Sequence, residues 1–96
     1  MIVIYQLVNG EMLVFEKDND RRYEWGTVTK PCRIVAIQQG GEIRLALQPY
    51  MWDLGKDDKV LINFANVVSH IEANKGICEL YKQTISPIVL PPGLTS

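Results

Sequence analysis

The sequence predicts a mainly β fold: a strongly bent, antiparallel small barrel followed by a carboxy-terminal α-helix. Three observations lead to this prediction. Short apolar runs alternate in the way that half-buried strands do. Turn residues, such as Asn9-Gly10 and Gly40-Gly41, separate these runs. Residues 74–85 instead carry their apolar side chains at helical spacing.

The first two strands are predicted to form a hairpin. Residues 2–8 are almost continuously apolar, which is typical of a strand buried on both faces or covered by another subunit. Asn9-Gly10 follows, and both residue types accept the positive φ angles of a tight hairpin turn. Residues 11–17 then return as the second strand.

Residues 18–22, Asp-Asn-Asp-Arg-Arg, form a polar loop that precedes Tyr23 and Trp25. Arginines beside aromatic rings can hold phosphates and stack on bases. The same residues also fit a solvated turn that leads into a strand, with Trp25 packed on the barrel. Both interpretations are open at this stage.

The middle of the chain should supply a bent strand and a hairpin. Residues 23–38 suit an extended segment with an irregularity at Pro31, because proline cannot donate a ladder hydrogen bond. A bend of this kind helps a short sheet to curl into a barrel. After a glycine turn, residues 42–51 alternate between apolar and polar. The side chains expected to point inward are Ile43, Leu45 and Leu47.

Residues 59–72 are the stretch around which we expect the chain to be organised. Their apolar run is interrupted once, at Ala65-Asn66, which predicts two short strands with a sharp bend between them. Asparagine tolerates left-handed backbone angles and offers donors and acceptors. A bend at residues 63–66 would therefore expose polar groups beside Phe64. Alternation equally allows Phe64 to fill the barrel core.

The carboxy-terminal part divides into a helix and a tail. A helix over about 74–85 is predicted, capped near Asn74, so the folded domain should cover residues 1–85. Residues 86–96 are proline-rich and cannot be helical. They form either a loose tail or an extended strap along a neighbouring subunit.

Composition limits the function. The 96 residues carry a net charge of −1, which argues against generic nucleic-acid binding; a ring of identical subunits can still repeat a local basic spot into a positive rim. No apolar run approaches the roughly 20 residues of a membrane span. The amino-terminal run lacks the features of a secretion signal. We therefore expect a cytoplasmic protein that does not enter a membrane.

Catalytic and metal-binding patterns are not found. Cys32 and Cys78 lack a nearby cysteine partner, so we expect packed, reduced thiols. The aspartates of residues 53–58 lack the ligand rhythm of a calcium loop. Ser69 and His70 point to opposite faces of a strand, and no glycine-rich phosphate loop follows a strand. We expect no enzymatic activity, no metal and no cofactor.

Two segments carry a resemblance to a known family. Residues 64–71 read Phe-Ala-Asn-Val-Val-Ser-His-Ile. This segment resembles the second signature of Sm and Sm-like RNA-binding proteins, in the form Tyr-Lys-His-Ala-Ile-Ser-Thr-Ile that is found in the bacterial RNA chaperone of that family. Residues 7–10, Leu-Val-Asn-Gly, resemble the turn after that family's first strand. The chain is also similar to small Sm-like proteins of marine phage, through residues 30–35 and 48–52 as well as the first turn.

The resemblance implies a five-stranded Sm-like (SH3-like) barrel, a homo-oligomeric ring, and RNA or single-stranded DNA as a partner. The nucleic-acid-binding residues that we expect are Asn63, Phe64, Asn66, Asp18, Asn19, Asp20 and Arg21. Two departures from the family are visible: Ala65 stands where the bacterial form has lysine, and the helix follows the strands instead of preceding them.

Two aromatic residues, Tyr50 and Trp52, lie beside a polar loop, and we expect them at a subunit interface because large aromatics are common there. The alternative is that they cover the core. The rival function is a non-enzymatic structural or assembly adaptor, which would bind protein partners through edge strands and the tail.

Overall fold

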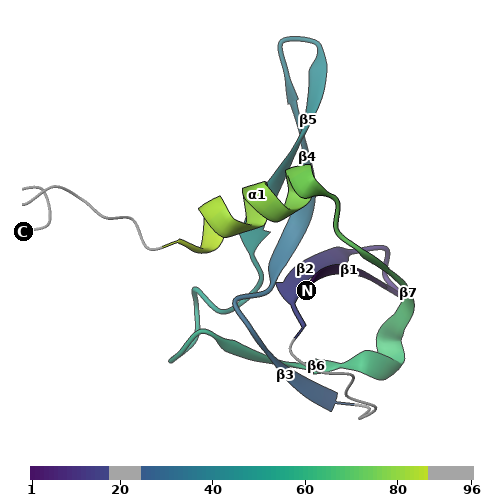
Figure 1. Cartoon of the computed structure of the whole chain (residues 1–96), viewed down its shortest axis with the longest axis vertical. Helices are drawn as coiled ribbons and strands as arrows, with labels where there is room; N and C mark the ends of the chain where they lie inside the picture. The colour runs from purple at the N-terminus through teal and green to yellow at the C-terminus, as the bar shows by residue number, and fades with distance from the viewer. Residues whose placement is uncertain (18–24, 87–96) are drawn as a thin grey trace, which may run out of the picture.

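The computed structural model describes residues 1–17 and 25–86, which form a mainly β structure with one carboxy-terminal helix (Figure 1). The strands are β1 (Ile2–Leu7), β2 (Met12–Glu16), β3 (Trp25–Thr29), β4 (Cys32–Gln39), β5 (Glu42–Pro49), β6 (Lys59–Asn63) and β7 (Val67–Glu72). A 3-10 turn, η1 (Phe64–Asn66), joins β6 to β7, and α1 (Lys75–Ile85) follows. The predicted mainly β class and the predicted helix are confirmed.

Five strands form one antiparallel sheet in the order β5-β4-β2-β1-β7, and β3 pairs with β6 in a separate ribbon. The closed five-stranded barrel was expected, but among the described residues the sheet does not close. The chain turns sharply between β3 and β4, where Lys30 has a φ of 49° and Pro31 has no N–H to donate. One long bent strand is therefore replaced by two strands in two sheets.

The β1–β2 hairpin is confirmed, but its turn differs from the expected one. Gly10 has a φ of 89°, whereas Asn9 is not in the positive region. Backbone bonds from Leu7 N to Glu11 O (2.8 Å) and from Gly10 N to Leu7 O (2.9 Å) close the turn. Asn9 acts through its side chain instead, since its Oδ1 accepts a hydrogen bond from Glu11 N at 2.9 Å.

Alternation along β1 and β2 divides the buried side chains between two cores. The first core lies between the sheet and the β3–β6 ribbon; its members are Val3, Tyr5, Leu7, Leu13, Phe15, Val28, Val60 and Ile62. The second core lies under α1; its members are Ile2, Val14, Cys32, Leu47 and Tyr81. Both central strands are thus buried on both faces, as their continuous apolar sequence predicts.

The β4–β5 hairpin projects away from the rest of the molecule (Figure 1). Three inward side chains were expected on β5, and only Leu47 is buried, at 9% exposure. Ile43 is 73% exposed and Leu45 is 55% exposed, so their expected burial is wrong. Alternation places these residues on one face, but beyond Leu47 no layer of the described structure covers that face.

Helix α1 begins as predicted. The Asn74 side chain accepts a hydrogen bond from Ile77 N at 2.9 Å, which satisfies one of the free N–H groups of the first turn. Tyr81, 1% exposed, points into the second core, and its hydroxyl donates to Lys30 O at 3.0 Å. The helix is therefore fastened to the point where β3 passes into β4. Over residues 1–17 and 25–86, no helix is long and apolar enough to cross a membrane.

Candidate nucleic-acid interface

The predicted bend is present as η1, between β6 and β7. Asn63 precedes it with a φ of −82°, so the left-handed angle considered for an asparagine is not used at this position. The Asn63 side chain accepts a hydrogen bond from Ala65 N at 3.0 Å. Its side-chain oxygen is therefore engaged in holding the turn, and its contribution to a binding surface is reduced.

A backbone contact ties the bend to the first hairpin. Val8 N donates to Asn66 O at 2.8 Å, close to an irregularity in the β1–β7 pairing between Gln6 and Leu7. The residues at positions 65 and 66 are exposed. Of the three bend residues proposed from the sequence, Asn66 is the one that is exposed, whereas Asn63 and Phe64 are half-buried.

Phe64 lies half-buried against the first core. Its ring packs edge-to-face on Tyr5, with 5.7 Å between the ring centroids. It lies nearly parallel to Phe15 at 6.5 Å, with an interplanar angle of 11°. A Cβ built at Gly26 would overlap the ring, reaching within 2.9 Å of Cζ and closer still to Cε2. Phe64 therefore packs directly on the backbone of β3, which favours the core interpretation over a freely exposed stacking platform.

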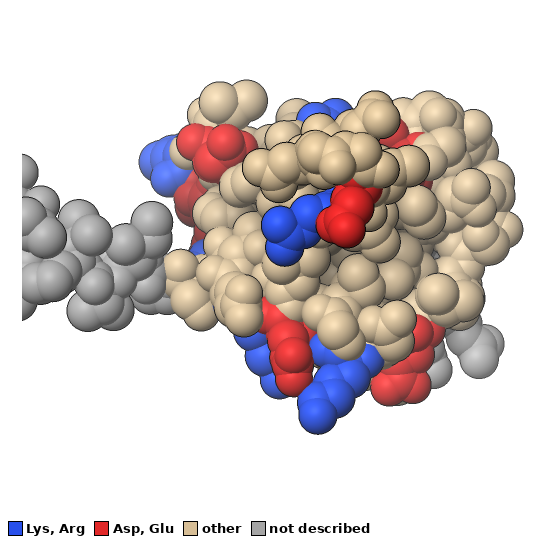
Figure 2. All heavy atoms as spheres, turned by 90° about the horizontal axis from the view of Figure 1, so that it is seen from above, with Lys and Arg blue, Asp and Glu red and all other residues tan. Residues whose placement is uncertain are grey.

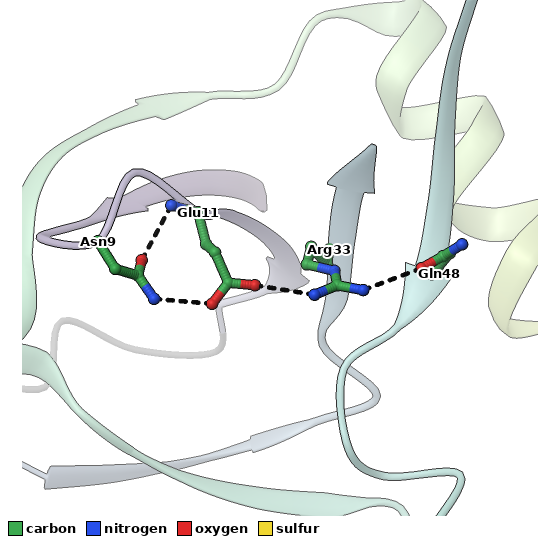
Figure 3. A network of polar contacts seen from close by, with 4 residues as sticks. All are labelled: Asn9, Glu11, Arg33 and Gln48. Atoms are coloured by element: carbon green, nitrogen blue, oxygen red, sulfur yellow. Dashed lines mark hydrogen bonds and ion pairs between the residues drawn. The ribbon is translucent and has the colours of Figure 1, made fainter. Parts of the chain in front are cut away.

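A polar network extends from the hairpin turn across the sheet (Figure 3). Asn9 Nδ2 donates to Glu11 Oε1 at 2.8 Å, and Glu11 Oε2 accepts from Arg33 Nη1 at 3.1 Å. Arg33 Nη2 donates to Gln48 Oε1 at 3.1 Å. Although the Arg33 side chain is 43% exposed, its charge is already paired with a carboxylate. It is thus a weaker candidate for a phosphate contact than an unpaired arginine.

Tyr50 and Trp52 both pack partly against the first core, and Trp52 also contacts the second. Trp52 Nε1 donates to Pro31 O at 2.7 Å, and Tyr50 N donates to the same oxygen at 2.8 Å. Both residues thus hold the corner between β3 and β4 within one subunit. Their expected role at a subunit interface stays a prediction.

The four candidates of the early loop, Asp18, Asn19, Asp20 and Arg21, lie outside the described residues. The structure therefore brings three of the seven proposed residues together, Asn63, Phe64 and Asn66, on one turn. It also shows a group that the sequence did not single out. Tyr5 and Phe15 meet Phe64 in one aromatic cluster. Their inward alternation in the first hairpin is the signal that could have identified them.

Two buried side chains have shifted pKa values. Burial raises the pKa of the Cys32 thiol from 9.0 to about 11, and the neighbouring Trp52 side chain opposes this shift. Burial also raises the pKa of Tyr81 from 10.0 to about 12, with the negative charge of a Cys32 thiolate adding to the effect. At neutral pH both groups stay protonated. A neutral, buried thiol is a poor nucleophile, so Cys32 acts as a packing residue.

Cys32 and Cys78 are free thiols, as expected. His70 is exposed on β7, and its ring lies 5.3 Å from that of Tyr5. Within the described parts of the chain, no three or more histidine, cysteine or acidic residues are grouped so as to hold a metal ion.

Comparison with protein-family models gives no match for this chain, and comparison with curated proteins gives none either.

Proposed function

We propose that the protein is a subunit of an Sm-like homo-oligomeric ring that binds RNA or single-stranded DNA. Both segments of the resemblance support this proposal by their positions. Residues 7–10 span the end of β1 and the turn toward β2, and residues 64–71 form η1 and most of β7. The hydrogen bond from Val8 N to Asn66 O joins the two segments. The resembling residues thus lie together in space although they are far apart in sequence.

The main structural support for a ring is that the strands on either side of the bend, β6 and β7, each have one unpaired edge. In the described structure β6 pairs only with β3, and β7 pairs only with β1. These edge strands expose large apolar side chains: Leu61 is 62% exposed, Val68 60% and Ile71 63%. An unpaired, apolar edge is a template for another strand.

A contact between the β6 edge of one subunit and the β7 edge of the next uses two different surfaces. Such a head-to-tail contact repeats from subunit to subunit and closes into a ring when the rotation allows. Because η1 lies between the two edges, each contact brings the bend of one subunit close to its neighbour. Copies of the exposed Asn66 amide are then repeated around the ring, where they can hydrogen-bond to bases.

Assembly is tested first, by light scattering of purified protein. We expect a multiple of the subunit mass. Leu61→Glu and Ile71→Glu should each reduce the mass, because each places a charge in the proposed contact. Leu54→Glu is the matched control, since Leu54 is 87% exposed in a loop and belongs to neither edge. A monomeric wild-type protein would contradict the ring.

Binding is then measured by fluorescence anisotropy with labelled single-stranded RNA and DNA over a salt series. The affinity should fall as salt rises, with a logarithmic slope of about −0.7 per phosphate contacted. Asn66→Ala should weaken binding without changing the mass. A protein that binds neither strand at low salt would refute the nucleic-acid part of the proposal.

The second candidate function is an assembly adaptor, and the β4–β5 hairpin favours it. The outer edge of β5 is unpaired within the described residues, and Ile37, Ile43 and Leu45 are exposed on the hairpin. Figure 2, which views the molecule from the side toward which this hairpin projects, shows basic and acidic side chains together near the centre and in groups around the edge of that face, with uncharged surface between them. An extended peptide of a partner protein could pair with such an edge. Leu45→Lys should then abolish partner binding and leave oligonucleotide binding unchanged.

A further inference from the structure

A cavity of about 270 Å³ lies between the end of β2, strand β3 and the end of α1. The aromatic cluster forms part of its wall, through Tyr5, Phe15 and Phe64, and Tyr81 and Ile85 contribute from the helix. The cavity thus lies between the five-stranded sheet, the β3–β6 ribbon and the helix.

One wall residue has an unused polar group. Tyr5 is 8% exposed, and its ring is fixed by contacts with Phe15 at 4.9 Å and with Phe64 at 5.7 Å. None of the hydrogen bonds within residues 1–17 and 25–86 involves its hydroxyl. Among the described residues, the buried side-chain N or O atom that lacks a partner is Arg33 Nε, so the Tyr5 hydroxyl keeps some access to solvent. A ligand in the adjacent cavity would replace that contact with water by a direct hydrogen bond.

The size of the cavity selects a small ligand. Sites for drug-sized molecules enclose about 300 to 1,000 Å³, and this cavity is just below that range. A single planar ring system is therefore the right size. Aromatic walls favour such a ring because they offer stacking and edge-to-face contacts.

Polar groups on β3 define the ligand further. Thr27 and Thr29 line the cavity, and each hydroxyl can donate or accept a hydrogen bond. Among the described residues, the charged members of the lining are Glu16, Lys17 and Lys30. Lys30 is held in position, since its Nζ donates to Ile85 O at 3.3 Å. This lining suits a ring with polar edges and either no charge or one negative charge.

We propose that this cavity binds one planar heteroaromatic ring, with the Tyr5 hydroxyl and the β3 threonines at its polar edge. Two sources share this chemistry: a nucleobase from a bound single strand, and a free aromatic small molecule. If the source is a strand, the inference deepens the proposed function and rests on it. If the source is a free molecule, the inference stands without it.

The test is a titration of the full-length protein, followed by NMR chemical shifts, with three probes: adenosine, indole-3-carboxylate and a single-stranded oligonucleotide. Thr27→Phe should fill the cavity and weaken saturable binding at least tenfold. Gln38→Phe is the matched control, because it adds the same ring to an exposed strand position that does not line the cavity. Tyr5→Phe keeps the ring and removes one hydroxyl, so it should weaken binding by roughly two- to tenfold.

The outcomes separate the two proposals. Each small probe is titrated to about 10 mM, a concentration that detects even very weak sites. If the protein binds the oligonucleotide but neither small probe saturates it, the cavity site is overturned and the proposed function remains in place. Binding of a small probe without the oligonucleotide would support the cavity and refute nucleic-acid binding. Small-probe binding that Thr27→Phe and Tyr5→Phe both leave unchanged would place the site elsewhere and overturn the inference.

Discussion

Replacing Phe64 by alanine measures how far this ring belongs to the core. Truncating a fully buried phenylalanine costs about 3 to 5 kcal/mol of stability. Phe64 is half-buried, so we expect about 2 kcal/mol, of which the edge-to-face contact with Tyr5 accounts for roughly 0.5 to 1.5 kcal/mol. For a domain of this size, such a loss lowers the melting temperature by about 8 to 16 °C.

Urea unfolding followed by circular dichroism gives the free energy directly. Asn66→Ala is the matched control from the same turn, since its exposed side chain should change stability by less than about 0.5 kcal/mol. A similarly small loss for Phe64→Ala would show that the ring stands free of the core. The packing argument would then be refuted, and the exposed stacking platform predicted from the sequence would be restored.

A double-mutant cycle sharpens this test. Gly26→Ala places a methyl group against the Phe64 ring, and overpacking of this kind typically costs about 1 to 3 kcal/mol. In the Phe64→Ala background the methyl group meets no ring, so the cost of Gly26→Ala should largely disappear. Additive losses in the double variant would mean that the two residues are not in contact.

The remaining predictions concern α1 and the second core beneath it. The unfolding free energy should fall with rising pH, because Cys32 and Tyr81 ionise in the unfolded chain at a lower pH than in the folded one. The loss begins above pH 9 for Cys32 and above pH 10 for Tyr81, and it ends near the folded pKa values of about 11 and about 12. Between its two pKa values, each group contributes at most about 1.4 kcal/mol per pH unit. Tyr81→Phe should cost about 1 kcal/mol at neutral pH by removing the hydrogen bond to Lys30 O, and should flatten the fall between pH 10 and 12; an unchanged slope in pH-dependent urea unfolding would contradict this assignment. Asn74→Ala should lower stability by about 1 kcal/mol through loss of the helix cap, whereas Asn74→Ser should retain most of it; equal unfolding midpoints for all three proteins would show that the cap contributes nothing.

Local chemistry explains most of what the sequence predicted correctly. The hairpin at Gly10, the glycine turn between β4 and β5, and the cap at Asn74 each depend on one or two residues and their immediate neighbours. The bend between β6 and β7 was also located correctly. The predicted geometry of the bend was less accurate, because Asn63 stabilises the turn through its side chain and not through a left-handed backbone conformation.

The candidate site was predicted less completely. Asn66 is exposed as a binding residue should be, whereas Phe64 packs on Gly26 from a strand about 40 positions earlier in the sequence. That contact joins two elements whose pairing no local pattern specifies. The cavity beside Tyr5 has the same origin, since its walls come from β1, β2, β3, η1 and α1.

The sequence alone determined which residues turn, which cap the helix and which share a strand face, because these properties depend on backbone preferences and on a period of two or 3.6 residues. Only the tertiary structure decided which faces are covered. Leu47 and Leu45 alternate identically, yet one is buried under α1 and the other is exposed beyond the end of that layer. The corner at Lys30 and Pro31 likewise directed β3 into a separate ribbon. Burial requires a second layer, and the position of that layer is a property of the whole chain.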